Sequence, residues 1–327
     1  MEMPTIAQAA QDYLETVRQA RSENTARTYS NALSIYFRVL KEYWIDPENS
    51  PVSAISEDSI TKMLAYLKNF SSATERLYLQ AVKGFYEYLT EENLVAINLP
   101  KVASLIKKRS RHPGQRLPQF PSEDIERVLE FAERLSSMLS DNPQERLRAM
   151  RDRAFLITLA DTGLRVHEAC NLKRAQVDWN EGRALVLGKG NKEAIVRLSR
   201  RSLRALRDYI SARAALDGAS GHPLPSLPLF ARHDKGAGKK VKPITTTTGR
   251  NIVTERVHQA LGDQDTGQIT PHSFRHYFVT VVLRGSGNLK LAQELARHAN
   301  IQVTQRYAHL SNDELDRGYH EIFEKDL

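Results

Sequence analysis

The chain has 327 residues, 41% of them hydrophobic, a length that supports about two domains with a core each. No apolar run is long enough to span a membrane, and the N-terminal residues lack the basic and apolar regions of a secretory signal. Cys170 is the one cysteine, which excludes an internal disulfide, and we expect a soluble cytoplasmic protein with no membrane partner.

The net charge of +8 is unevenly distributed along the chain. Residues 311–327 carry a net charge of −4, so residues 1–310 carry +12. A basic body favours a polyanionic partner such as a nucleic acid.

Residues 5–100 have the pattern of a bundle of about four helices. Hydrophobic side chains recur every three or four residues, as at Tyr29, Leu33 and Tyr36, which predicts helices with one buried face. We place a helical N-terminal domain at residues 1–106.

The helical periodicity stops between Lys101 and Pro121, where proline and glycine predict a linker, placed at residues 107–121. Its basic side chains, which we treat as candidate DNA contacts, are Lys107, Lys108, Arg109, Arg111 and Arg116. Such a segment is either a flexible tether or a connection that follows a phosphate backbone.

The second domain, residues 122–327, begins with two helical patterns and a turn. Helices are predicted at residues 122–139, 146–160, 202–216 and 251–261, and a long loop at residues 217–249. Gly163 suits a left-handed helix end, and Arg165 follows it with Glu168 on the same helical face. The pair is either an ordinary surface ion pair or an arginine that Glu168 aims at a phosphate.

Residues 183–198 change to strand periodicity and predict a β-hairpin. Lys189 lies at its tip between two glycines. A turn lysine is usually only solvated, but a mobile tip can also deliver an ammonium group to a leaving oxygen.

Residues 270–310 are dense in groups that handle a phosphate. A Thr-Pro pair predicts a helix start that puts His272 in the first turn, with Arg275 on the same face. Helix N-termini carry unpaired N–H groups and partial positive charge, so this pair would form a small anion site. His298 and, nine residues later, Tyr307 complete a candidate phosphoryl-transfer centre with the tyrosine as nucleophile, although a single tyrosine is more often a core residue.

His272 and His276 also form an H-x-x-x-H pair of the kind that holds a metal ion. The zinc hydrolase motif has Glu at its second position, where this chain has Ser273, and no other His or Cys cluster occurs in the sequence. We therefore expect neither a metal nor a cofactor.

The acidic segment 311–327 has Leu315, Tyr319, Ile322 and Phe323 at helical spacing. This pattern predicts an amphipathic helix that either folds back on its own domain or docks on a neighbouring copy.

The order of these motifs resembles that of the tyrosine recombinases, the phage-integrase and Xer-type group. The motifs are Thr-Gly-Leu-Arg165-x-x-Glu168, Gly-Lys189-Gly, His272-Ser-Phe-Arg275-His276, and His298 followed by Tyr307. Residues 24–29 and 84–89 resemble the core-binding domain of the same family.

The resemblance implies a mainly α fold with a small antiparallel sheet. A helical, SAM-like core-binding domain would be joined to an α+β catalytic domain, closing on DNA as a C-shaped clamp. It also implies a site-specific DNA recombinase that works without metal through a 3′-phosphotyrosine intermediate and a Holliday junction. The implied partners are two double-stranded DNA sites and a homotetramer assembled through residues 311–327.

The resemblance further implies a role for each motif residue. Arg165 and Arg275 would clamp the scissile phosphate, and Glu168 would support the clamp. The other roles are proton transfer by His272 and Lys189, a hydrogen bond to the phosphate from His298, and attack by Tyr307. A type IB topoisomerase and a catalytically inactive DNA-binding relative are the alternatives.

The chain departs from the family at Ala296-Arg297, where Leu-Gly usually precedes the second catalytic histidine. Arg297 either adds a phosphate contact or alters the local turn and slows the reaction. The sequence does not specify the DNA target, the direction of recombination, accessory proteins or the oligomeric state without DNA.

Overall fold

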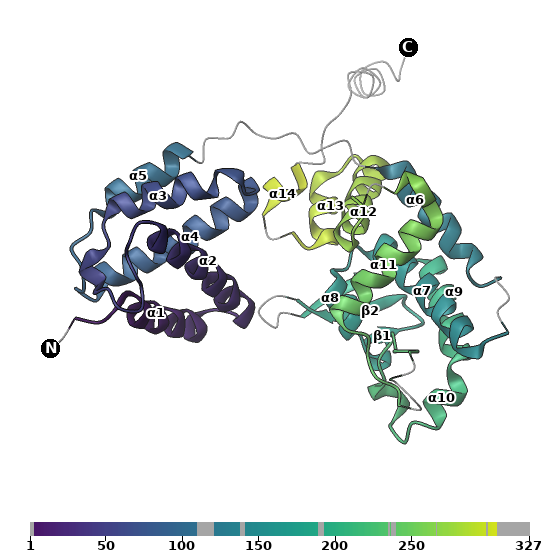
Figure 1. The fold of residues 1–327 in the computed structure, drawn as a ribbon. Coiled ribbons are helices and arrows are strands. Elements are labelled where there is room, and N and C mark those ends of the chain that lie inside the picture. The colour runs from purple at the N-terminus through teal and green to yellow at the C-terminus, as the bar shows by residue number, and fades with distance from the viewer. Residues whose placement is uncertain are drawn as a thin grey trace, which may run out of the picture. The chain divides into compact units, whose positions relative to one another are not determined.

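The computed structural model describes residues 3–109, 121–137, 141–188, 193–234, 236, 240–265, 267–298 and 300–305. The chain divides into two compact units, Met1–Gln115 and Arg116–Leu327, which we call the N-terminal and C-terminal units (Figure 1). Over the described residues, no helix is long and apolar enough to cross a membrane.

The N-terminal unit is a helical bundle, as predicted. Its elements are α1 (Ile6–Ala20), α2 (Glu23–Glu42), η1 (Val52–Ala54), α3 (Glu57–Tyr66), η2 (Leu67–Asn69), α4 (Ser72–Glu91) and α5 (Leu99–Arg109). Thr5, Ser22 and Ser71 begin helices by accepting a backbone N–H bond at their hydroxyl groups. The buried Tyr36 and Tyr86 hydroxyl groups lie 2.6 Å apart, so the core satisfies its own polar groups.

Helix α5 corrects the predicted start of the linker. The sequence pattern ends helical periodicity at Lys101, whereas α5 continues to Arg109. Val102 is fully buried, and Leu105 packs against the same core, so the helix is fixed by contacts three residues apart. Arg109 donates from Nε to Glu75 at 3.0 Å. Lys107 and Lys108 are likewise in the last turn of a helix, while Arg111 and Arg116 lie outside the described residues.

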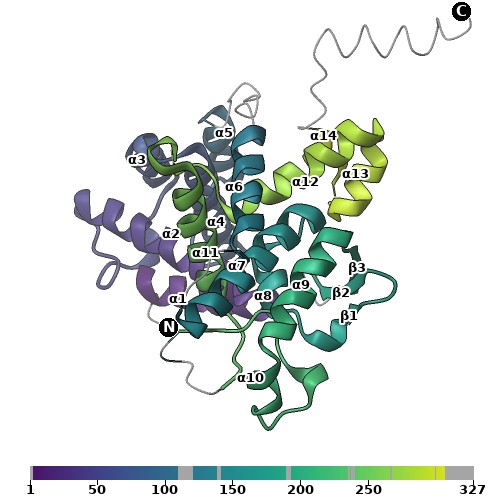
Figure 2. The same ribbon diagram turned by 90° about the vertical axis from the view of Figure 1, so that its right-hand side faces the viewer.

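The C-terminal unit contains a three-stranded antiparallel sheet among helices (Figure 2). Its α-helices are α6 (Ser122–Arg134), α7 (Pro143–Thr162), α8 (Val166–Asn171), α9 (Arg200–Ala212), α10 (Ala214–Gly218), α11 (Thr246–Leu261), α12 (Pro271–Ser286), α13 (Leu289–Ala296) and α14 (Ile301–Gln305). Its strands are β1 (Val177–Asp178), β2 (Arg183–Leu187) and β3 (Glu193–Arg197), and its short 3-10 helices include η3 (Arg174–Gln176), η4 (Leu224–Ser226) and η6 (Gly262–Gln264). The predicted hairpin is confirmed, with Arg183 opposite Arg197 and Leu187 opposite Glu193.

Helix α7 is the centre of the C-terminal unit and is buried on several faces, with contacts to α6, α9, α11 and α12. It starts at Pro143, earlier than predicted, because Asn142 caps it by accepting from the Gln144 N–H at 2.9 Å. Helix α11 also starts early, at Thr246, because the Thr245 hydroxyl accepts from the Thr248 N–H at 3.1 Å.

Gly163 ends helix α7 in a left-handed conformation, with φ 61°. A Cβ atom at this position would lie 2.5 Å from a Phe278 ring carbon, so both the backbone and the available space require glycine. The predicted C-cap is therefore confirmed. The sharp turn directs the chain from the core helix straight into Arg165 and α8.

Candidate active site

Arg165 is placed by the first turn of α8. Its backbone N–H donates to Glu168 Oε2 at 2.9 Å, and its Nη1 donates to Glu168 Oε1 at 3.1 Å. The Glu168 side chain is fully buried, whereas that of Arg165 is 42% exposed. A buried carboxylate therefore fixes one edge of an accessible guanidinium, and the structure brings this predicted pair together.

Glu168 keeps its negative charge despite its burial. Desolvation acts to raise its pKa, but hydrogen bonds and positive charge from Arg297 and Arg165 outweigh it, so the pKa lies below its ordinary value. The carboxylate is thus available to orient both arginines at neutral pH.

Arg275, on α12, holds together two segments that are distant in sequence. Its Nη1 donates to the carbonyl oxygen of Gly163, and its Nη2 donates to that of Ala296. Arg275 is only 3% exposed. The predicted anion site on the first turn of the helix implied a more accessible side chain. Burial occurs because the guanidinium fills the space between the end of α7 and the end of α13.

His272 lies in the first turn of α12, as predicted. Thr270 is the N-cap, Pro271 follows it, and the Thr270 N–H donates to Ser273 Oγ at 3.1 Å. Although His272 is accessible to solvent, partial desolvation, followed by the charges of Arg275 and Arg165, lowers its pKa below the ordinary value. The imidazole is therefore neutral at neutral pH and able to accept a proton.

His298 follows the end of α13 and is oriented by a buried hydroxyl group. Its Nδ1 lies 2.9 Å from Oγ1 of Thr304, which has no exposed surface. Desolvation, followed by Arg275, Arg165, His272 and Arg297, lowers the pKa of His298 to about 4. The charges of Arg275 and Arg165 lower the pKa of both His272 and His298, so the two histidines share an electropositive environment.

His276 lies beside His272 on α12 and completes the predicted H-x-x-x-H pair. Its ring lies 4.3 Å from that of His272 in an edge-to-face arrangement, measured between centroids. Desolvation and then His272, His298 and Arg275 lower its pKa to about 4. Among the residues that the structure describes, no group of three His, Cys, Asp or Glu side chains is arranged to hold a metal ion.

Arg297 makes a contact that the sequence did not suggest. It ends α13 in the left-handed region, with φ 57° and ψ 45°, and its Nη2 donates to Glu168 Oε2 at 2.8 Å. The left-handed backbone explains why glycine suits this position in the family. The sequence gives no direct signal for the contact with Glu168, which lies 129 residues away. Lys189 and Tyr307 lie outside the described residues.

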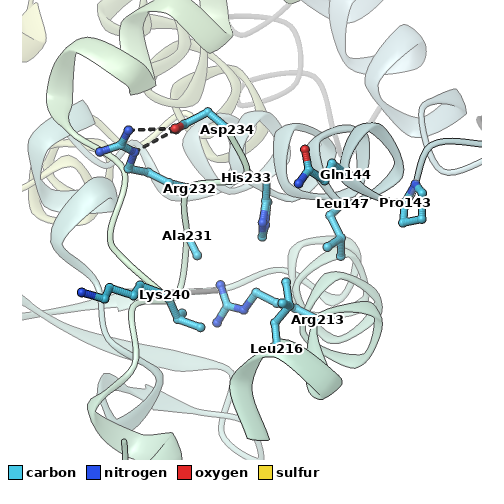
Figure 3. A pocket seen from close by; sticks show the side chains of 11 residues that line it. Pro143, Gln144, Leu147, Arg213, Leu216, Ala231, Arg232, His233, Asp234 and Lys240 are labelled. Carbon is cyan, nitrogen blue, oxygen red and sulfur yellow. Dashed lines mark hydrogen bonds and ion pairs between the residues drawn. The ribbon is translucent and has the colours of Figure 1, made fainter. Parts of the chain in front are cut away.

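A cavity of about 210 Å³ lies elsewhere in the C-terminal unit (Figure 3). Leu147 and Gln144 from the start of α7 line it, together with Arg213, His233 and Lys240. Leu147 comes 16 residues before the turn at Gly163, so the cavity and that turn are separated by about 24 Å of helix. The cavity is therefore not part of the arginine and histidine site.

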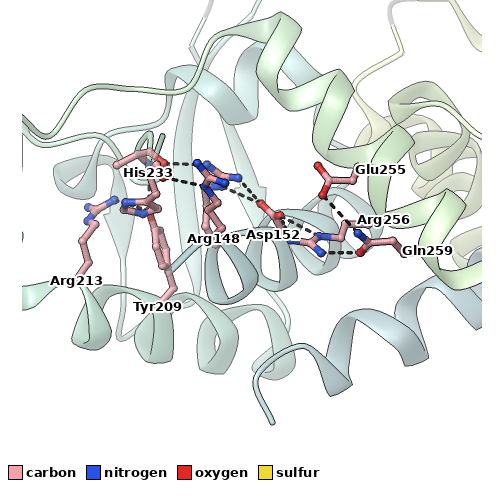
Figure 4. A network of polar contacts seen from close by, with 10 residues as sticks. Arg148, Asp152, Tyr209, Arg213, His233, Glu255, Arg256 and Gln259 are labelled. Carbon is pink, nitrogen blue, oxygen red and sulfur yellow. Dashed lines mark hydrogen bonds and ion pairs between the residues drawn. The ribbon is translucent and has the colours of Figure 1, made fainter. Parts of the chain in front are cut away.

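Buried polar contacts beside this cavity fix the scaffold (Figure 4). Asp152 on α7 accepts from Arg256 on α11 at 2.7 Å. The Tyr209 hydroxyl group on α9 lies 2.7 Å from His233 Nε2, and it accepts from Arg213 Nη1 at 3.0 Å. Burial and nearby arginines lower the pKa of His233 to about 3, so this histidine is a neutral structural group. The network joins α7 to α11, and through His233 it holds the predicted long loop against Tyr209 on α9 and Arg148 on α7.

Comparison with known proteins identifies the family. Residues 120–314 match the family described as "Phage integrase family", and residues 10–93 match "Phage integrase, N-terminal SAM-like domain". The chain therefore belongs to the phage integrase family. It is a tyrosine recombinase, which confirms the resemblance seen in the sequence.

Relatives of similar length support this assignment. The chain is 30% identical over 297 residues to tyrosine recombinase XerC of Thermodesulfovibrio yellowstonii, covering 90% of this chain and 88% of the relative. It is also 30% identical over 308 residues to tyrosine recombinase XerC of Bacillus pumilus, covering 94% and 92%.

Solved structures share the fold. The XerH site-specific recombinase bound to palindromic difH substrate, a post-cleavage complex, has a TM-score of 0.67 at 21% identity, covering 94% of this chain and 82% of that one. The Tn1549 transposon integrase in complex with circular intermediate DNA has a TM-score of 0.64 at 17% identity, covering 97% and 99%. These likenesses confirm the predicted mainly helical fold with a small antiparallel sheet.

Proposed function

We propose that this tyrosine recombinase cleaves and rejoins duplex DNA at specific sites through a covalent bond to Tyr307. The observation that carries the proposal is that two arginines meet at the turn that ends α7. Arg165 is oriented by the buried carboxylate of Glu168, and Arg275 is bonded to the Gly163 carbonyl group of the same turn.

The arginines supply charge where the reaction needs it. Attack on a phosphodiester builds negative charge on the non-bridging oxygens, and preorganised guanidinium groups stabilise that charge. The partly exposed Arg165 meets the phosphate while Glu168 holds its other edge. A metal ion is not needed for this role, because the two fixed cations perform it.

The neutral histidines have roles in the attack of Tyr307 on the phosphodiester. The Tyr307 oxygen forms a bond to phosphorus as its proton passes to His272, and the bond from phosphorus to the 5′-oxygen breaks. Lys189 gives a proton to that leaving oxygen, so the products are a 3′-phosphotyrosine and a free 5′-hydroxyl group. His298 donates a hydrogen bond to a phosphate oxygen. The reverse step joins the 3′-end to a 5′-hydroxyl group of another strand and gives a Holliday junction.

Both units and the acidic tail have roles in DNA binding and assembly. We propose that the N-terminal unit and the C-terminal unit close around one DNA site as a clamp, with Lys107, Lys108 and the basic residues that follow them near the backbone. Residues 311–327, with a net charge of −4, would dock on a basic neighbouring copy and build a tetramer on two sites. A protein that acts on DNA in this way would work in the cytoplasm.

The alternative activities are not favoured. The two relatives named above are tyrosine recombinases, and the charged residues expected of an active centre are present in the sequence. Both points weigh against a type IB topoisomerase and against an inactive DNA-binding relative.

The covalent step is tested with a suicide DNA site, in which a nick lets the cleaved end diffuse away. Wild type should form a protein–DNA adduct that survives a denaturing gel. Tyr307→Phe should bind the same DNA and form no adduct, because only the nucleophilic hydroxyl group is lost. Tyr43→Phe, a change at an exposed tyrosine of the N-terminal unit, is the matched control and should form the adduct normally. An adduct in Tyr307→Phe would refute the proposal.

A further inference from the structure

Arg297 has two features that are unfavourable for an arginine, a left-handed backbone and a largely buried side chain. Its backbone lies in the left-handed region at φ 57°, which is less favourable for arginine than for glycine. Its side chain is also only 14% exposed, and its Nε has no hydrogen-bond partner within the described part of the chain. Both features cost free energy in the folded protein, and the rest of the guanidinium makes an interaction that offsets this cost.

The compensating interaction is the bond to Glu168. Arg297 Nη2 donates to Oε2 at 2.8 Å, while Arg165 Nη1 donates to Oε1 at 3.1 Å. The carboxylate is fully buried, so solvent and salt screen these contacts only weakly. Two positive charges therefore share one negative charge, which leaves this group of three side chains with a net charge of +1.

Sharing the carboxylate limits how Glu168 can hold Arg165. An arginine and a carboxylate left alone tend to pair through two parallel hydrogen bonds between their side chains. Here Oε2 is already occupied by Arg297 and by the Arg165 backbone N–H, so the Arg165 side chain makes a single bond to Oε1. Among the described residues the Arg165 guanidinium donates to Glu168 alone, so its other N–H groups are available to a phosphate.

Arg297 also joins the same two segments that Arg275 joins. Arg275 bonds to the carbonyl groups of Gly163 and Ala296, and Arg297, the next residue after Ala296, bonds to Glu168. The turn before α8 and the end of α13 are thus connected twice. His298 follows directly on the second connection.

We propose that Arg297 is a positioning residue of the recombination reaction, holding Glu168 so that Arg165 and His298 stay aligned on the scissile phosphate without itself contacting DNA. This inference rests on the proposed function of the site. A glycine at this position would have no side chain to reach Glu168, so this positioning requires a side chain such as that of Arg297.

Three variants distinguish the effect of the Arg297 guanidinium from the effect of its backbone conformation. Arg297→Met keeps the stem and removes the guanidinium, Arg297→Lys keeps a charge, and Arg297→Gly removes the guanidinium but also relieves the left-handed backbone. We expect Met and Gly to slow single-turnover cleavage by about ten- to a hundredfold, the effect of losing one charged hydrogen bond. Lys should recover part of that rate.

Thermal unfolding checks that the effect is not a loss of folding. Arg297→Gly should be at least as stable as Arg297→Met, because glycine adopts the left-handed backbone freely. Slow cleavage in a stable Arg297→Gly protein supports positioning by the guanidinium. Normal cleavage in that variant would overturn the proposal, since the backbone alone would then account for any defect in Arg297→Met.

The closing experiment compares positioning through Glu168 with direct contact to DNA. Adduct formation on the suicide site is measured for wild type, Arg297→Met, Glu168→Gln and the double variant, together with the salt dependence of binding to a single site. If Arg297 acts through Glu168, the double variant cleaves no more slowly than the slower single variant. The salt slope, by which we mean the change in the logarithm of the binding constant with the logarithm of the salt concentration, is then the same for Arg297→Met and wild type.

Two results would overturn the inference. Independent effects that multiply in the double variant, or a salt slope reduced by about one in Arg297→Met, would mean that Arg297 binds a phosphate directly. The salt slope decides between the two models even where Glu168→Gln does not cleave. Absence of an adduct in wild type is a different outcome, because it would refute the proposed function and not the role of Arg297 alone.

Discussion

Replacing Gly163 with alanine tests whether the turn between α7 and α8 places the arginines. Gly163 has φ 61°, and a Cβ there would meet a Phe278 ring carbon at 2.5 Å. The left-handed backbone costs alanine about 1–2 kcal/mol, and overpacking against the partly buried ring adds about 1–3 kcal/mol. We expect Gly163→Ala to lower the free energy of unfolding of the C-terminal unit by about 2–5 kcal/mol.

Two other glycines provide matched controls. Gly287 also has φ 61°, but no atom of the described residues would lie within 4 Å of a Cβ there, so Gly287→Ala measures the backbone cost alone. Gly285 lies within α12, has no positive φ and has the same open space around it. Gly285→Ala should be neutral or stabilising by up to about 1 kcal/mol, because alanine is the better helix former.

Urea unfolding and single-turnover cleavage measure the two consequences of Gly163→Ala. Stability should fall in the order Gly285→Ala, Gly287→Ala, Gly163→Ala. Cleavage should slow in the last variant alone, because the Gly163 carbonyl group accepts from Arg275 and Arg165 follows two residues later. If Gly163→Ala matched Gly287→Ala in both stability and cleavage, the turn would not be placing the arginines.

The histidines, the lysine and the acidic tail each lead to a further prediction. The cleavage rate should show no acid limb at about pH 6.5, the ordinary histidine value, because the pKa of His272 lies below that value and the pKa of His298 is lowered to about 4, so both imidazoles are still neutral there. An acid limb at about pH 6.5 would indicate an unperturbed histidine instead. EDTA should leave cleavage intact, while Arg275→Ala should slow it by about a hundredfold or more; loss of cleavage in EDTA that zinc or magnesium restores would support a metal at the histidine pair. Lys189→Ala should be slow on normal DNA but largely rescued by a 5′-thiol leaving group, which departs without a proton, and equal impairment on both substrates would give Lys189 a binding role. Truncation after Leu310 should leave binding to one site near wild type and abolish higher-order complexes on two-site DNA; unchanged complexes in a gel-shift titration would mean that the tail packs on its own domain.

Local signals predicted most of the elements that build the site. The Thr270-Pro271 start of α12, the glycine end of α7 and the β2–β3 hairpin each depend on residues that are neighbours in sequence, and the structure contains all of them. Helix α5 was the main error in the N-terminal unit. Its lysines and arginine make the short apolar face difficult to recognise in the sequence. The helix is fixed by contacts with the rest of that core.

The arrangement of charged side chains depends on long-range contacts that no local pattern encodes. Arg275 has the spacing of an exposed helix face, yet it is buried because the carbonyl groups of Gly163 and Ala296 meet it from two other segments. The sequence marked Arg297 as a departure from the family. Its left-handed backbone and its bond to Glu168 emerged only once α8 and α13 were placed together.

Mapping the covalent adduct tests the central claim most directly. After cleavage of a suicide site, nuclease and protease digestion followed by mass spectrometry should find a nucleotide linked through its 3′-phosphate to the peptide that contains Tyr307, and the released strand should carry a free 5′-hydroxyl group. A nucleotide on any other residue, or a linkage through a 5′-phosphate, would contradict the account.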